Sequence, residues 1–264
     1  MNTSLFVALA AALATTEIEP KMALTAAIEA NWLAGKLDWQ DAIPVELSCG
    51  RPAKPELVTP QNVAQRGVKT PEGRARLLHA IVHIEFTAIN LALDHAARFR
   101  GMPKQYYADW IGVAAEEAYH FRILRERLQA LGHDYGDFPA HGGLWDMAER
   151  TTHDALSRMA LVPRLLEARG LDATPPIQKK LIQSGDHETA RLLDIILRDE
   201  IGHVGLGDTW FRQLCHDQEL EPESTFRRLL KEFGAPRPQA PMNETARLQA
   251  GFTKVELADL LKIE

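Results

Sequence analysis

Two pentapeptides decide the fold, Glu116-Glu117-Ala118-Tyr119-His120 and Asp199-Glu200-Ile201-Gly202-His203. Both read acid-Glu-x-x-His. Residues i and i+3 of an α-helix lie on one face one turn apart, so the Glu and the His can bind the same ion. A bare Glu-x-x-His is expected about once by chance in such a chain, but the form with a preceding acid only about 0.1 times. Two copies are therefore unlikely to arise by chance, and they indicate an ion-binding site formed by helices.

A further glutamate precedes each copy by about the length of one helix. Glu85 lies 32 residues before Glu117, and Glu167 lies 33 residues before Glu200. In an antiparallel helix pair, residues equidistant from the turn face each other. A turn at Gly101–Pro103 would thus bring Glu85 level with Glu117 and His120.

The second half repeats this arrangement under one condition. Its midpoint falls at Ser184-Gly185, which serves as the turn only if the helix that carries Glu167 resumes after a break at Gly170–Pro176.

Apolar residues surround these acids on their predicted helix faces. Burial of a carboxylate on an apolar helix face costs free energy unless the carboxylate is paired or binds a metal. Six donors that point into one four-helix core would form the di-iron or di-manganese site of ferritin-like bundles. Surface or salt-bridged acids on amphipathic helices are the alternative. The predicted metal ligands are Glu85, Glu117, His120, Glu167, Glu200 and His203.

The rest of the chain reads as helices separated by Pro and Gly, so we predict an all-α fold. It is a ferritin-like four-helix bundle with extra N- and C-terminal helices and a long Pro-rich loop, in a single domain over 1–264. The bundle core spans about 71–217, between N-terminal helices and loop (1–70) and C-terminal helices (218–264). The expected helices are 20–35, 71–100, 104–131, 143–169, 177–183, 186–216, 222–233 and 254–262, and the loop is 44–71.

Composition excludes several classes of protein. The chain has 264 residues, ten His and only two Cys, which rules out a disulfide framework and a thiolate zinc site. A net charge of −6 argues against a DNA-binding protein.

The apolar run 5–14 lacks the preceding Lys or Arg of a signal peptide, so we expect a packed helix there. No unbroken apolar run reaches the length of a membrane span, and we expect a cytoplasmic protein.

Weaker features leave alternatives open. Glu116 and Asp199 either accept the second N–H of a ligand histidine or are surface acids. Pro163 either only bends its helix or adjusts the position of Glu167. His83 should point away from Glu85. Three glycines without side chains leave space on one helix face, either for a substrate cavity or for close packing of another helix. They are Gly202, Gly205 and Gly207.

Several segments together resemble the ferritin-like domain-of-unknown-function family 455 (DUF455), over nearly the whole chain. The resemblance implies a ferritin-like bundle with the same six ligands, and it supplies no substrate. The segments are His79–Glu85, Asp109–Phe121, Tyr135–His141, Met159–Asp172, Arg198–His203 and the loop Arg51–Pro55.

From these patterns we expect a di-metal oxidoreductase with two iron ions, or alternatively Mn/Fe or two Mn, and with O2 as co-substrate. It would oxidise or hydroxylate an unknown small molecule or RNA. An external electron donor is expected, because no flavin or nicotinamide motif is present, and so is a homodimer. The alternatives are a non-catalytic iron- or manganese-binding or storage protein, and a tRNA-modifying hydroxylase that would use the basic stretch 51–76.

Overall fold

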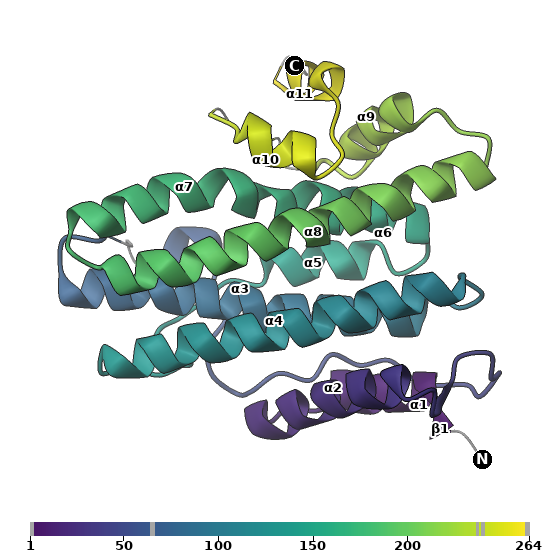
Figure 1. The fold of residues 1–264 in the computed structure, drawn as a ribbon, viewed down its shortest axis with the longest axis horizontal. Coiled ribbons are helices and arrows are strands. Elements are labelled where there is room, and N and C mark those ends of the chain that lie inside the picture. The colour runs from purple at the N-terminus through teal and green to yellow at the C-terminus, as the bar shows by residue number, and fades with distance from the viewer. Residues whose placement is uncertain (1–2, 64–66, 236–237, 239–240, 262–264) are drawn as a thin grey trace. The chain divides into compact units, whose positions relative to one another are not determined.

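The structure is a computed structural model that describes residues 3–63, 67–235, 238 and 241–261. The chain is mostly helical, which confirms the all-α prediction (Figure 1). The strands in these ranges are β1 (Thr3–Ser4) and β2 (Leu37–Asp38), a parallel pair. The α-helices are α1 (Leu5–Ala14), α2 (Ile18–Leu33), α3 (Pro71–Arg98), α4 (Lys104–Ala130), α5 (Gly143–Arg150), α6 (Ala155–Leu161), α7 (Ala168–Gln183), α8 (His187–Asp217), α9 (Pro222–Glu232), α10 (Glu244–Gln249) and α11 (Lys254–Leu260).

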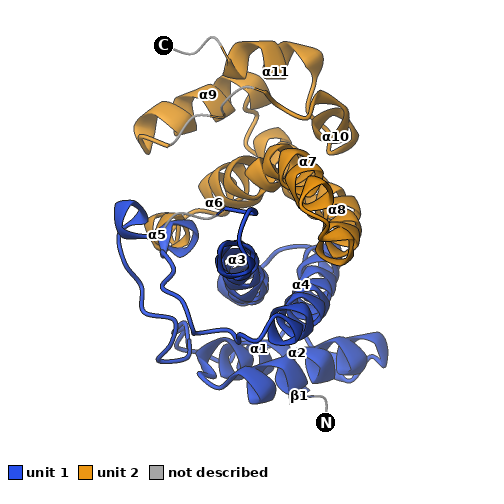
Figure 2. Cartoon of the chain, turned by 90° about the vertical axis from the view of Figure 1, so that its left-hand side faces the viewer, with its two compact units in different colours: residues 1–145 blue, residues 146–264 orange. Residues whose placement is uncertain are grey.

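Two compact units divide the chain, and Figure 2 colours them separately. Unit 1 is Met1–Trp145 and unit 2 is Asp146–Glu264. Each unit has one pair of long neighbouring helices, α3 with α4 in unit 1 and α7 with α8 in unit 2. The single domain predicted over 1–264 stays a prediction.

In unit 1 the helix pair forms as the sequence predicts. The side chain of Thr70 caps α3 by accepting a hydrogen bond from the backbone N–H of Gly73. Gly101 ends the helix with a φ of 77°, a left-handed conformation that favours glycine. The helix predicted over 5–14 is α1, which packs on α3 and α2.

Helix α3 is long and apolar enough to cross a membrane by length and composition. Within the protein, however, 72% of its most apolar window is buried. The core helix of a soluble protein passes the same test, so the composition of α3 is weak evidence for a membrane span.

A lysine buried in unit 1 joins three helices. Lys21 of α2 donates from Nζ to the carbonyl oxygens of Ala12 and Leu13, both at 2.9 Å, and to Oδ1 of Asn90 at 2.7 Å. Its ammonium thereby satisfies carbonyls at the C-terminal end of α1. Burial, opposed by the charge of Cys49, lowers the pKa of Lys21 from 10.5 to about 8.

This shift predicts a pH-dependent stability. The unfolded chain binds more protons than the folded chain between pH 8 and pH 10.5, so Lys21 makes folding more favourable as the pH rises through this window. The stability of the wild type relative to Lys21→Met should grow by about 3 kcal/mol across it. Urea unfolding at both ends of the window measures the difference. Lys36→Met, at an exposed position, controls for loss of a lysine charge. A constant difference would contradict the assignment.

In unit 2 the break predicted at Gly170–Pro176 is wrong, because α7 runs continuously through it. Pro175 has no N–H to donate to the carbonyl of Leu171. The side-chain amide of Asn243 donates to that oxygen instead, at 3.2 Å, so the helix continues. The predicted turn at Ser184-Gly185 is present, with a φ of 84° at Gly185.

The helix predicted over 143–169 is broken at a different place. It ends after Arg150 as α5, and Asp154 caps α6 by accepting from the N–H groups of Leu156 and Ser157. Val162–Glu167 then forms a π-helix, η2, whose second residue is Pro163. Four further elements were not predicted: α10, a short 3-10 turn at Pro60–Asn62 and the two strands. Residue 262 of the last predicted helix lies outside the described residues.

The glycines of α8 have different surroundings. A Cβ atom on Gly207 would lie 2.5 Å from Cβ of Pro163, so this glycine permits close packing of α8 on η2. A Cβ on Gly205 would only touch Ala250 at 3.8 Å, and one on Gly202 would meet no atom within 4 Å. For Gly207 the close-packing alternative therefore holds.

Alanine substitutions should separate these positions. Gly207→Ala should lower the free energy of unfolding by about 1–3 kcal/mol, because the methyl group overpacks the contact with Pro163. Gly202→Ala should raise it by up to about 1 kcal/mol, since it removes only the conformational freedom of a helical glycine. Urea unfolding of both variants is the test, and a neutral Gly207→Ala would contradict the contact.

Candidate metal centre

Three predicted ligands come together inside unit 1. Glu85 lies on α3, and Glu117 and His120 lie on α4, and all three are buried. One ligand atom from each lies within 4.8 Å of the other two. Nδ1 of His120 is 3.4 Å from a carboxylate oxygen of Glu85 and 3.4 Å from one of Glu117. The antiparallel pairing inferred from the turn at Gly101–Pro103 thus produces the predicted juxtaposition.

Burial and mutual charge dominate the electrostatics of this triad. Burial and the neighbouring carboxylate of Glu117 raise the pKa of Glu85 to about 8. For His120, burial lowers the pKa, but the hydrogen bonds and charges of Glu117 and Glu85 outweigh it and raise the pKa to about 11. Two buried acids thus converge on one imidazole, which carries a compensating proton when no other cation is present.

This donor set fits a divalent transition-metal ion. Carboxylates are hard ligands and imidazole is a borderline one, and this combination suits Fe²⁺ or Mn²⁺. A divalent ion would also compensate the two buried negative charges, which are costly in a low-dielectric interior.

Unit 2 repeats the Glu-x-x-His geometry on α8. Nδ1 of His203 is 3.3 Å from a carboxylate oxygen of Glu200, close to the 3.4 Å between His120 and Glu117. His203 is buried and the side chain of Glu200 is 13% exposed. The two copies of the motif therefore agree in local geometry as well as in sequence.

Glu167, the predicted fourth carboxylate, is the last residue of η2 and is half-buried. Both η2 and α7 pack on α8, and a Cβ on Gly170 would lie 3.9 Å from Cγ of Glu200. Among the described residues of unit 2 alone, no three ligand atoms gather as closely as the triad of unit 1. The structure thus puts Glu167 on an element that packs against the Glu200 helix, without grouping it with Glu200 and His203.

The weaker candidates of the sequence, Glu116, Asp199 and His83, lie in different environments. Glu116 is exposed. Asp199 accepts hydrogen bonds from the guanidinium of its neighbour Arg198 at 2.8 and 3.2 Å. Their proposed contacts with ligand histidines stay predictions. His83 does point elsewhere, with Nδ1 at 3.0 Å from the hydroxyl of Tyr135, and burial lowers its pKa to about 4.

The basic stretch 51–76 makes several contacts within its own unit. Arg76 bonds Glu72 and lies over the ring of Phe138, and Arg74 donates to the carbonyl of Val68. Arg66 lies outside the described residues. The pair with Glu72 neutralises the charge of Arg76, and none of these contacts tests the tRNA alternative, which stays a prediction.

Sequence reasoning missed the role of Arg164. This residue is fully buried in η2, where it contacts Asp208, Glu256 and three phenylalanine rings. A signal was present, because Arg164 is the one charge in the otherwise apolar run Met159–Leu166. A lone charge in such a run needs a buried partner.

Comparisons with known proteins give a family and no activity. The model of a protein family described as "Protein of unknown function (DUF455)" matches residues 14–258. An "Uncharacterized protein" from Haemophilus influenzae is 47% identical over 234 residues, which cover 86% of this chain and 81% of that protein. No solved structure matches the chain.

Proposed function

The chain belongs to the DUF455 family, and we propose that it is a di-metal carboxylate oxidoreductase, most simply a di-iron protein with a ferritin-like four-helix bundle. Each Glu plus Glu-x-x-His set would hold one ion. The set of unit 1 is Glu85, Glu117 and His120, and the set of unit 2 is Glu167, Glu200 and His203.

The buried triad of unit 1 carries this proposal. Two carboxylates and an imidazole converge where water is largely excluded, and no stabilising role in the core requires two acids side by side. The repeated Glu-x-x-His geometry on α8 supports a second ion. The alternative interpretation is surface or salt-bridged acids. Surface acids do not account for a Glu85 that is 5% exposed and a Glu117 that is 2% exposed, and a salt bridge to His120 would pair two acids with a single imidazole.

The chain's own residues would bind and electrically balance the ions. Four carboxylates neutralise two divalent ions, so the pair could change oxidation state without leaving a large net charge in the interior. The i, i+3 spacing orients each imidazole toward the carboxylate one turn away on its own helix. When reduced, the bound ions would supply electrons to O2 for oxidation of a substrate, and a separate donor would return the ions to the reduced state.

Metal analysis with spectroscopy tests the proposal. Protein purified without oxygen should contain about two iron or manganese ions per chain, as the two ligand sets require. After exposure to O2, electron paramagnetic resonance should report a magnetically coupled pair, and optical bands should develop with it. A pair that binds but never reacts with O2 would instead support storage or structural metal binding. Protein that takes up neither iron nor manganese would overturn the proposal.

A further inference from the structure

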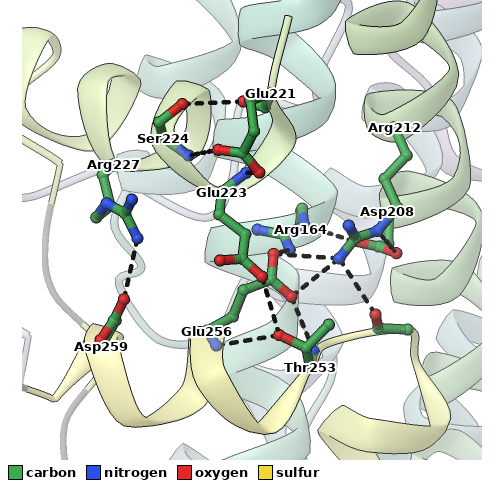
Figure 3. Close-up of polar contacts among 11 residues, drawn as sticks. Arg164, Asp208, Arg212, Glu221, Glu223, Ser224, Arg227, Thr253, Glu256 and Asp259 are labelled. Carbon is green, nitrogen blue, oxygen red and sulfur yellow. Dashed lines mark hydrogen bonds and ion pairs between the residues drawn. The ribbon is translucent and has the colours of Figure 1, made fainter.

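A buried arginine in unit 2 connects the Glu167 segment to the helix that carries Glu200 and His203. Arg164 is 0% exposed and lies in η2 (Figure 3). Its Nε donates to Oδ1 of Asp208 on α8 at 2.6 Å, and its Nη2 donates to Oε1 of Glu256 on α11. A single side chain thus links three separate elements.

A second arginine closes the network. Arg212 of α8 donates from Nε to Asp208 at 2.8 Å and from Nη2 to Glu256 at 2.9 Å (Figure 3). Two guanidinium groups therefore share two carboxylates, and the charges of the four groups sum to zero. A buried network of this kind fixes geometry when its members are hydrogen-bonded, and removal of one member leaves an uncompensated charge.

Aromatic rings surround the guanidinium of Arg164. Its Cζ lies 4.2 Å from the ring centroid of Phe226 on α9, 4.5 Å from that of Phe252 and 5.1 Å from that of Phe211 on α8. Arg164 therefore has little freedom to change rotamer, and the backbone of η2 is held with it.

The C-terminal helix α11 is also fixed by this network. Thr253 and Glu256 form a capping box, in which the N–H of Thr253 donates to Glu256 at 2.8 Å and the N–H of Glu256 donates to Thr253 at 3.1 Å. The carboxylate of Glu256 thus caps its own helix and binds Arg164 at the same time. Packing of α11 and the register of η2 are coupled through one carboxylate.

The register of η2 decides where Glu167 points. A π-helix contains one more residue than the α-helix it interrupts, and a one-residue change of register rotates the following side chains by about 100°. Pro163 packs on Gly207, and Arg164 binds Asp208, so two consecutive residues of η2 are fixed to consecutive residues of α8. These contacts lie three and four residues before Glu167 and one to two turns beyond His203.

We propose that Arg164 is a positioning residue that keeps η2 in its π register and so orients Glu167 relative to Glu200 and His203 for binding of an ion. This inference rests on the proposed function. It adds that the C-terminal segment, through Glu256, controls the coordination of one ion of the two.

Co²⁺ titration of Arg164→Met tests the inference, because the visible absorption of Co²⁺ reports ligand geometry. The wild type should bind two Co²⁺ ions. Arg164→Met should bind one of them at least about tenfold more weakly, as expected for loss of a group that orients a ligand, and its absorption should shift. The other ion, at Glu85, Glu117 and His120, should bind as in the wild type. Hydrogen exchange should increase at residues 162–170.

Two further variants separate positioning from loss of stability. Arg158→Met removes another fully buried arginine of unit 2, which binds Thr151 and the carbonyl of Ala148, and it should leave both Co²⁺ affinities unchanged. Glu256→Gln keeps the side-chain shape and should weaken the same ion as Arg164→Met. It serves as the test if Arg164→Met does not fold.

The outcomes are distinct. If Arg164→Met, or Glu256→Gln in its place, keeps both affinities and the wild-type spectrum, the positioning role is wrong and the proposed function stands. If Arg158→Met weakens the same ion equally, the effect is one of general stability and the positioning role is again wrong. A wild type that binds no Co²⁺ overturns both the inference and the proposed function.

Discussion

Replacement of Glu117 with Gln should lower the affinity of unit 1 for Fe²⁺ by on the order of 100-fold or more. Loss of a residue that merely orients a ligand costs about 10–100-fold, and loss of a ligand itself should exceed that. Gln keeps the volume and one hydrogen-bonding oxygen of Glu117, so the buried triad should stay packed. Removal of the charge leaves Glu85 as the one carboxylate of the set. Anaerobic Fe²⁺ titration followed by metal analysis measures the change.

Glu126→Gln is the matched control for this variant. Glu126 lies on the same helix, is exposed and pairs with Arg122 on the surface. Its substitution removes the same charge from α4 and should leave Fe²⁺ binding as in the wild type. Equal metal content in Glu117→Gln and in the wild type would show that unit 1 holds no ion through this residue.

The helix pair of unit 1 and its register could be predicted because local signals agree with the packing. Thr70 with Pro71 predicts the start of α3, and Gly101 predicts its end. With both ends known, the antiparallel geometry alone places Glu85 near Glu117 and His120. The segments that resemble DUF455 all lie within residues 14–258, which the family model matches.

The break in the third long helix was misplaced because tertiary contacts override local propensity there. Pro175 and Pro176 normally interrupt a helix, but Asn243, which lies 72 residues beyond Leu171, supplies the missing donor. The sequence near residue 170 has no feature that predicts the contact with Asn243. Conversely, the break at Thr151–Asp154 has a local signal in the capping side chain of Asp154.

The π-helix at Val162–Glu167 could be inferred only in part. Pro163 predicts a disturbed helix, but a bend and a π register leave the same pattern in sequence. The choice depends on Gly207 and Asp208, which lie on another helix and contact Pro163 and Arg164. Sequence alone therefore leaves the direction of the Glu167 side chain open.

Removal of metal should destabilise the wild type strongly, and it should reverse the sign of the stability difference between Glu85→Gln and the wild type. At free metal a thousandfold above the dissociation constant, each bound ion stabilises the folded chain by roughly 4 kcal/mol, so a chelator should lower the free energy of unfolding by about 8 kcal/mol for two ions. Without metal, Glu85 and Glu117 are two buried acids beside a single imidazole. Glu85→Gln removes one of these acids and leaves the Glu117–His120 pair intact.

In chelator, Glu85→Gln should therefore be more stable than the wild type by about 1–3 kcal/mol, because the folded wild type must either take up a proton on Glu85, whose pKa is raised to about 8, or bury two like charges. In saturating Fe²⁺ it should be less stable, because unit 1 no longer binds its ion tightly. Urea unfolding of the variant and the wild type, in chelator and in Fe²⁺, measures this crossing, which is the change in sign of their stability difference. Asp109→Asn, a charge removal near the N-terminal end of α4, should show no crossing. If Glu85→Gln is less stable than the wild type in both conditions, the carboxylate of Glu85 stabilises the core by itself and its burial is no sign of a metal site.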